Sequence, residues 1–174
     1  MAVKVNHKHS IHKGRVFVLE RENVTLPNDV TIDIDVIRHP GAAAIVPLTT
    51  DGRVVMIRQY RHAVGGYIWE IPAGTLDAGE APGDCARREL AEETGFRADE
   101  WETMGQIVPV PGYSDERIHL FLARHLSPTH QNLDHDEVLN VQPLSWRKAL
   151  EMIDTGEIID GKTICALLLA DRRI

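Results

Sequence analysis

The hydrophobic pattern at the start of the chain predicts β-structure. Residues 14–20 are predicted to form a short strand, and turn-forming residues follow at 26–29. Residues 30–37 then alternate between apolar and polar at a period of two, which is typical of a half-buried strand. We therefore expect residues 1–39 to form an N-terminal antiparallel β segment.

The rest of the chain, residues 40–174, combines apolar runs with helical patterns. The runs at 42–48 and 54–60 are joined by Thr50-Asp51-Gly52, which is typical of a hairpin-like turn. Further strands are predicted at 67–72, 101–109, 117–124 and 137–143, and helices at 82–95, 145–154 and 162–171. Because strands and helices do not alternate regularly, this order favours an α+β fold, or an α/β/α sandwich.

Composition and charge exclude several classes of protein. A chain of 174 residues with 43% hydrophobic and 26% charged residues is an ordinary globular domain, not a disordered or disulfide-stapled one. Its longest apolar runs are far below the ~20 residues that a membrane span needs. Since 26 acidic residues face 19 basic ones, the net charge of −7 argues against a broad nucleic-acid surface.

The cysteines and the N-terminus bear on location. Cys85 and Cys165 have neither a CxxC nor a zinc spacing, and residues 1–13 contain no apolar export segment, so we expect reduced thiols and a cytoplasmic protein. The same stretch contains three histidines that could bind a metal. We expect them to lie in a mobile polar terminus instead; they are His7, His9 and His12.

Three glutamates in the helix predicted at 82–95 point to metal chemistry. Glu89 is three residues from Glu92 and four from Glu93, so all three carboxylates share one helix face. Carboxylates ~5 Å apart repel by about 3 kcal/mol per pair at an effective dielectric of 20. Hard oxygen ligands on one rigid face suit magnesium or manganese. The alternative is a solvated helix face whose acids are neutralised by Arg87 and Arg88.

The longer pattern around this helix decides between these alternatives. Residues 74–96 fit G-x5-E-x7-R-E-U-x-E-E-x-G-U, where U is a bulky apolar residue. Seven fixed positions match by accident roughly once in 10⁸ to 10⁹ trials at ordinary residue frequencies. This stretch resembles the Nudix box, and the chain is similar to Nudix hydrolases. The flanking segments that resemble the ADP-ribose pyrophosphatase branch are 58–61, 69–74, 111–116 and 156–163.

The resemblance implies a fold, an activity and a metal site. It implies a Nudix-type α/β/α sandwich with a mixed sheet, and hydrolysis of the diphosphate bond of ADP-ribose or a related nucleoside diphosphate sugar. Two or three magnesium ions, for which manganese could substitute, would be held by Glu89, Glu92, Glu93 and the carbonyl of Ala73. Arg88, together with Glu80, would orient these carboxylates.

Residues on the substrate side follow from the same resemblance. Arg58 and Arg61 would clamp phosphate oxygens, although each could instead be a surface arginine at a strand end. Glu70 would line the site or pair with an arginine, since an acid in so apolar a strand needs a partner. Tyr113 and Glu116 fall in the segment that resembles the branch near the substrate's terminal sugar or the metals, and the alternative for Glu116 is a solvated loop.

The catalytic base is not assigned by position, because Asn140 stands where relatives often have a glutamate. An acidic loop precedes this residue, and Glu137 is the first candidate, before Asp136 and Asp134. Glu116 is the next candidate if none of these acts. A plain acidic loop is the alternative.

The sequence leaves more than one interpretation of the assembly, of the substrate and of the class of protein. The resemblance implies a homodimer in which residues 14–39 help to build the partner's nucleotide pocket, with Phe17 stacking on adenine; the alternative is that Phe17 is ordinary core of its own domain. A hexose conjugate such as GDP-mannose or UDP-glucose is the alternative substrate. A non-catalytic Nudix-fold ligand sensor is the alternative of another class, and the intact box carboxylates argue against it.

Overall fold

The computed structural model describes residues 3–174, which divide into two compact units. The first unit comprises the chain up to Gly41 together with residues 108–117. The second unit comprises residues 42–107 and 118–174. None of the helices within residues 3–174 is long and apolar enough to cross a membrane.

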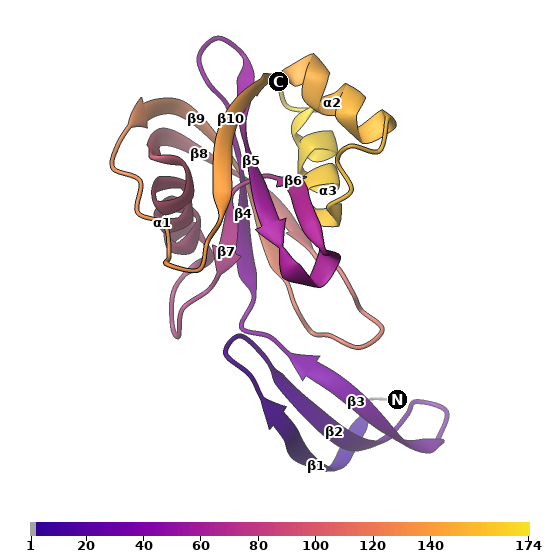
Figure 1. Cartoon of the computed structure of the whole chain (residues 1–174). Helices are drawn as coiled ribbons and strands as arrows, with labels where there is room; N and C mark the ends of the chain where they lie inside the picture. The colour runs from indigo at the N-terminus through magenta and orange to yellow at the C-terminus, as the bar shows by residue number, and fades with distance from the viewer. Residues whose placement is uncertain (1–2) are drawn as a thin grey trace. The chain divides into compact units, whose positions relative to one another are not determined.

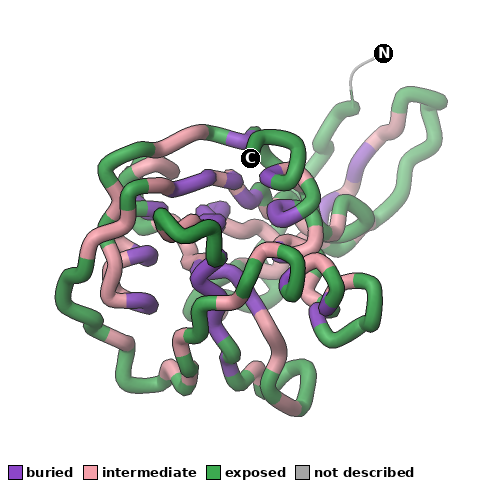
Figure 2. Tube along the Cα trace, turned by 90° about the horizontal axis from the view of Figure 1, so that it is seen from above, coloured by how far each residue is buried: buried purple, intermediate pink, exposed green. Residues whose placement is uncertain are grey.

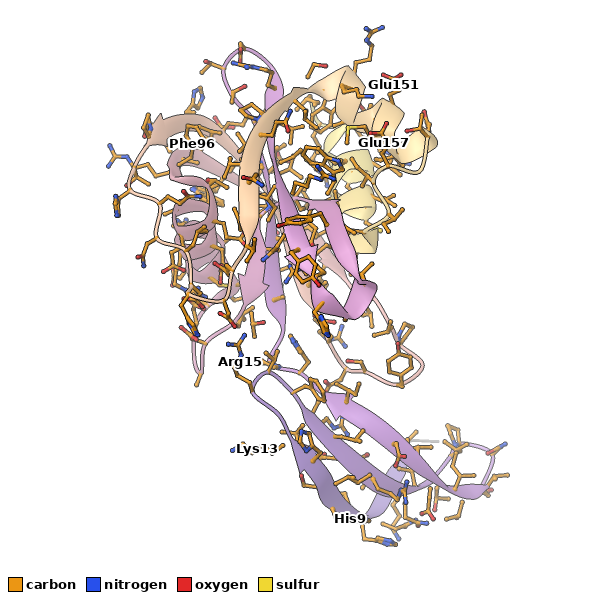
Figure 3. The ribbon with its side chains drawn as sticks, in the orientation of Figure 1. His9, Lys13, Arg15, Phe96, Glu151 and Glu157 are labelled. Atoms are coloured by element: carbon orange, nitrogen blue, oxygen red, sulfur yellow. The ribbon has the colours of Figure 1, made fainter. Side chains whose placement is uncertain are left out.

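The first unit is a three-stranded antiparallel sheet in the order β1-β2-β3. Its strands are Lys4–Lys13, Val18–Thr25 and Thr31–Arg38. The expectation of a mobile polar terminus is wrong, because the three N-terminal histidines lie in β1, which pairs along its length with β2. Figure 3 shows the side chains of His9 and Lys13 on this exposed strand.

The segment 108–117 joins this sheet although it is distant in sequence. The amide of Ile37 in β3 donates to the carbonyl of Tyr113 over 2.7 Å, and the amide of Asp115 donates back to the carbonyl of Ile37 over 3.1 Å. Arg38 adds a side-chain bond to Asp115 and also binds Glu22. The loop is therefore held to β3 by both backbone and charge.

The second unit contains two sheets and three helices (Figure 1). One sheet has the order β7-β4-β9-β8, in which β4 (Ala42–Pro47) runs parallel to β9 (Ile118–Pro128). The other strands of this sheet are β7 (Ala73–Thr75) and β8 (Phe96–Ile107). The second sheet has the order β10-β5-β6, formed by Leu139–Ser145, Arg53–Arg61 and Gly66–Glu70. A short 3₁₀ turn, His62–Val64, connects β5 to β6.

Helices cover both faces of β4, as the sandwich prediction requires. Ala43 and Ile45 pack on Leu90 of α1 (Pro82–Thr94), whereas Ala44 and Val46 belong to the cluster that includes α2 (Trp146–Asp154) and α3 (Gly161–Ala170). All six residues of β4 are buried, and Figure 2 shows many buried positions in the interior of the part of the chain that carries the C-terminus. The predicted hairpin at Thr50-Asp51-Gly52 is correct only at its tip: Leu48 bridges Val54, but β4 and β5 then enter different sheets.

Helix α1 begins and ends where its sequence predicts. Pro82 occupies the first turn, where its missing amide hydrogen is not needed, and Asp84 complements the positive end of the helix dipole. Gly95 ends the helix with φ of 70°, a left-handed conformation that glycine adopts without strain. Cys85 and Leu90 face the sheet. This packing fixes the orientation of the glutamates on the adjacent helix face.

Candidate active site

The predicted carboxylate face lies where α1 meets β7. Glu93 is 1% exposed and Glu89 is 7% exposed, while Glu92 is more open to solvent. Oε2 of Glu93 accepts a hydrogen bond from the amide of Ala73 over 2.9 Å. A Cβ atom at Gly74 would come within 1.8 Å of Oε1 of Glu89, so the backbone of β7 passes directly beside that carboxylate. The structure therefore brings together the residues that the sequence assigned to metal binding.

Arg88 connects Glu89 and Glu92 to a further acid, Glu80. Arg88 donates through Nε and Nη2 to the two carboxylate oxygens of Glu80, both over 2.9 Å. Its Nη1 donates to Glu89 over 2.5 Å and to Glu92 over 3.2 Å. The bond from Arg88, followed by one from the amide of Asp77, lowers the pKa of Glu80 to about 2. We refer to Glu80, Arg88, Glu89, Glu92 and Glu93 as the α1 cluster.

The α1 cluster has more negative charge than its single arginine can balance. Burial raises the pKa of Glu89 to about 7, against the opposing effect of Arg88. Burial likewise raises the pKa of Glu93 well above its usual range, and the neighbouring charges of Glu89 and Glu137 add to this effect. Glu137 thus acts on the same carboxylates from another part of the chain.

The donor set of this cluster fits a divalent cation. Within residues 3–174 the carboxylates do not converge into a ready-made metal site, since Nη1 of Arg88 holds one oxygen each of Glu89 and Glu92. They nevertheless provide hard oxygen donors that are largely withdrawn from water and carry excess negative charge. These are the properties that magnesium and manganese favour.

A second group of charges surrounds Glu70, whose side chain is 1% exposed. Arg61 binds it with a two-pronged contact, Nε to Oε1 over 2.7 Å and Nη2 to Oε2 over 2.8 Å. Nζ of Lys162 also donates to Oε2 of Glu70, and to Asp160 over 3.0 Å. Burial alone would raise the pKa of Glu70, but Arg61 and Lys162 together lower it. We refer to these four residues as the Glu70 cluster.

The two clusters act on each other electrostatically. The pKa of Arg61 is raised mainly by its hydrogen bonds to Glu70, and the charge of Glu93 contributes to the same shift. The expected pairing of Glu70 with an arginine is therefore present, next to the acids of α1.

The acidic loop before β10 is ordered by Glu137 itself. Its Oε2 accepts from the amide of Asp134 over 3.0 Å, and its own amide donates to the carbonyl of Asp134 over 3.0 Å. The charge of Glu137 acts on both Glu89 and Glu93.

Comparison with known proteins identifies the family. The profile of the NUDIX domain family matches residues 38–167, which is most of the chain. The chain belongs to the Nudix family. The resemblance found in the sequence, and the pyrophosphatase enzyme class that it implied, are confirmed.

Relatives with curated names are similar over nearly their full length. The chain is 38% identical over 162 residues to an ADP-ribose pyrophosphatase of Bacillus subtilis, covering 92% of this chain and 88% of the relative. It is 40% identical over 159 residues to a methanol dehydrogenase activator of Bacillus methanolicus, covering 90% and 86%. It is 36% identical over 172 residues to a GDP-mannose pyrophosphatase of Escherichia coli K12, covering 86% and 89%.

A solved structure confirms the predicted α+β sandwich. The crystal structure of an ADP compounds hydrolase superposes with a TM-score of 0.86, covering 99% of this chain and 94% of that chain at 21% sequence identity. At this identity the likeness concerns the fold.

The structure separates Arg58 from Arg61, although the sequence analysis assigned both of them to phosphate binding. Arg58 and Arg61 are three apart on β5, so they project from opposite faces of the sheet. Arg61 meets Glu70, whereas the guanidinium of Arg58 lies 5.7 Å from the ring centre of Tyr67 and 6.0 Å from that of Trp69. Arg58 therefore packs on aromatic rings and is not part of the Glu70 cluster.

Three further predicted residues belong to the first unit. Phe17 is 40% exposed and Tyr113 is 55% exposed. The amide of Glu116 donates to Ser114, and Oε1 of Glu116 lies 3.8 Å from Nδ1 of His39. That nitrogen already accepts from the amide of Gly41, so it has no proton to offer Glu116. The contact is therefore not a hydrogen-bonded ion pair.

Lys162 and Asp160 were not among the predicted site residues. The segment 156–163 resembled the pyrophosphatase branch, but nothing in its sequence indicated which buried acid the lysine would meet 92 positions away. A lysine two residues after a helix-capping aspartate was the available clue, because a cation is disfavoured at a helix N-terminus.

Proposed function

We propose that this Nudix enzyme hydrolyses the diphosphate bond of ADP-ribose or a related nucleoside diphosphate sugar, giving a nucleoside monophosphate and a sugar phosphate. The observation that carries the proposal is the α1 cluster, in which buried Glu89 and Glu93 lack a sufficient counter-charge. The names of relatives at 36–38% identity support this substrate class.

The proposal includes dependence on a divalent cation, magnesium or manganese. Glu89, Glu92, Glu93 and the carbonyl of Ala73 would hold it. Bound there, it would neutralise phosphate oxygens and lower the pKa of water. Arg88 would keep the carboxylates oriented through its bonds to Glu89 and Glu92.

The substrate side of the reaction is assigned to Arg61. Its Nε and Nη2 are engaged by Glu70, while Nη1 has no hydrogen-bond partner among residues 3–174. Nη1 can therefore donate to an oxygen of the diphosphate without breaking an existing bond. Because Arg61 lies near Glu93, a diphosphate held there would be within the field of both clusters.

Glu137 is the proposed general base that accepts a proton from the attacking water. Glu137→Gln should lower kcat by about 100-fold with little change in KM, since general bases typically contribute 10²–10⁴-fold. Steady-state kinetics at saturating magnesium would measure this, with Asp134→Asn and Asp136→Asn as comparisons. If all three variants keep kcat within about twofold of the wild type, the base lies elsewhere and Glu116 is tested next.

Substrate class is tested by a panel of nucleotide sugars assayed with magnesium and with EDTA, the products being separated by chromatography. ADP-ribose should give AMP and ribose 5-phosphate, and turnover should stop in EDTA. Faster turnover of GDP-mannose, which the Escherichia coli relative's name makes the second candidate, would change the substrate but not the reaction. Full activity of a metal-stripped sample in excess EDTA would contradict the proposal.

We also propose a homodimer in which the first unit helps to form the partner's nucleotide pocket, with Phe17 as a stacking surface. Several apolar side chains of this small sheet remain exposed, and a three-stranded sheet needs a covered face to be stable. An active ~20 kDa monomer in sedimentation at micromolar concentration would contradict the dimer. If the Phe17→Ala variant is a dimer that binds nucleotide normally, the dimer stands and Phe17 is not part of the pocket.

A further inference from the structure

Lys162 occupies an unfavourable position. It is the second residue of α3, where the helix dipole is positive and a cation is disfavoured. Its side chain is only 13% exposed, so the ammonium group has also lost most of its water. A charged residue that breaks a local rule in this way is expected to have a compensating role.

Anchoring the helix does not account for the lysine. Asp160 caps α3 by accepting from the amide and the hydroxyl of Thr163, over 3.0 Å and 2.6 Å. The same hydroxyl oxygen accepts from the amide of Ile71 over 2.9 Å, which ties the helix to the chain after β6. The cap and the bond from Ile71 would therefore hold the N-terminus of α3 in place even without the bonds of Lys162 to Asp160 and Glu70.

The charge balance of the Glu70 cluster does depend on the lysine. The cluster contains two acids, Glu70 and Asp160, and two bases, Arg61 and Lys162. Without Lys162, Arg61 would face two carboxylates alone, in addition to the nearby charge of Glu93. An anionic ligand would then approach a region of net negative charge.

The orientation of Glu70 and Arg61 depends on Lys162 as well. Oε2 of Glu70 accepts from both Arg61 and Lys162, while Oε1 accepts from Arg61 alone. The lysine thus fixes one oxygen of the carboxylate, and the carboxylate fixes the plane of the guanidinium. Nη1 of Arg61 is left pointing away from Glu70, because Nε and Nη2 form the edge that contacts the carboxylate.

We propose that Lys162 is a positioning residue for the substrate: its ammonium group holds Glu70 and offsets Asp160, so that Arg61 keeps both its orientation and its attraction for a diphosphate. This inference rests on the proposed function, since it assumes a diphosphate at Arg61. It extends that function by assigning substrate affinity to a residue that touches no substrate atom.

The test separates the charge of Lys162 from its hydrogen bonds and its bulk. Lys162→Gln keeps a donor but no charge, Lys162→Met keeps only the bulk, and Lys162→Arg keeps the charge. The first two variants should raise KM for ADP-ribose about tenfold and leave kcat within about threefold, while Lys162→Arg stays within about threefold of the wild type in both. Lys148→Met, which removes an exposed lysine from α2, is the matched control and should change neither constant.

Binding of ADP with magnesium, measured by calorimetry, distinguishes the two proposals. ADP contains the diphosphate but no sugar to release, so the wild type should bind it about tenfold more tightly than Lys162→Gln. If the wild type hydrolyses no nucleotide sugar but shows this difference for ADP, the proposed function is wrong and the role of Lys162 stands. If hydrolysis is normal and Lys162→Gln matches the wild type in KM and in ADP affinity, the role of Lys162 is wrong.

Folding is checked by circular dichroism and thermal unfolding of each variant. Should both Lys162→Gln and Lys162→Met fail to fold, or should kcat fall as much as KM rises, Lys162 is a structural residue and the proposal is overturned. A Lys162→Arg variant as impaired as Lys162→Met would also overturn it, because a charge at this position would then not be sufficient.

Discussion

The α1 cluster and the Glu70 cluster are built from the same residue types but differ in their balance of charge. The α1 cluster contains four glutamates and one arginine, which binds three of them, whereas the two acids of the Glu70 cluster are matched by two bases. Burial accordingly has opposite outcomes: the pKa of Glu93 is raised, while the pKa of Glu70 is lowered. The α1 cluster therefore has an excess of acids that a cation could offset, whereas the charges of the Glu70 cluster are matched within the chain.

Neutralising Glu93 should have the largest effect on activity. Glu93→Gln removes a proposed metal ligand but can keep the bond from the amide of Ala73, so kcat should fall by at least ~100-fold, or about 3 kcal/mol of barrier. Its free energy of unfolding in EDTA should be no lower than that of the wild type, because burial and the charge of Glu89 already disfavour the ionised form of Glu93. Kinetics and urea unfolding measure the two effects.

The control for this variant is Glu151→Gln, which changes an exposed helix residue (Figure 3) and should alter neither quantity. A marked loss of stability in Glu93→Gln would show that the α1 cluster is balanced after all, and the contrast with Glu70 would disappear.

Neutralising Glu70, unlike neutralising Glu93, should lower the free energy of unfolding. Glu70→Gln leaves Arg61 and Lys162 without their shared counter-charge, and breaking such a buried pair typically costs 3–5 kcal/mol. Because the side chain of Arg61 is 40% exposed, we expect a loss of about 2–3 kcal/mol of unfolding free energy. Urea unfolding with and without magnesium gives this value.

An exposed ion pair in the same unit provides the comparison for Glu70. Glu100→Gln removes one of the two carboxylate partners of Arg124 and leaves Glu102, so its unfolding free energy should be nearly unchanged. If Glu70→Gln behaved in the same way, the Glu70 cluster would contribute orientation without stability.

A methyl group at Gly74 should produce the smallest of these effects. In Gly74→Ala the new Cβ would overlap Oε1 of Glu89, so this carboxylate must move away from β7. We expect the magnesium concentration for half-maximal activity to rise about tenfold, as is usual when the support of a metal ligand is disturbed. Gly66→Ala, whose Cβ would meet nothing within 4 Å, should leave this concentration unchanged.

Local features of the sequence were sufficient to predict the α1 cluster. Pro82 and Gly95 delimit the helix, and spacings of three and four place the glutamates on one face. Such features act over a few residues, so a site that lies on a single helix and its preceding loop can be predicted from the amino-acid sequence alone.

Features that depend on distant pairing could not be predicted in this way. β1 was missed because register shifts after Val5 and Ser10 break its alternation, and because it is exposed throughout. The divergence of β4 and β5 into two sheets, and the meeting of Lys162 with Glu70, depend on tertiary packing that no turn or periodicity encodes. The role of the 1–39 segment in dimer formation stays a prediction.

The bond between β3 and the 108–117 segment has a consequence for how this protein could have been assembled in evolution. A chain that begins at residue 42 would keep this segment but lose Ile37, the backbone partner of Tyr113 and Asp115. A fragment that ends at residue 41 would lack the segment altogether. One recombination event that added or removed the N-terminal strands would therefore leave one side of this contact, in the loop between β8 and β9, without its backbone partner.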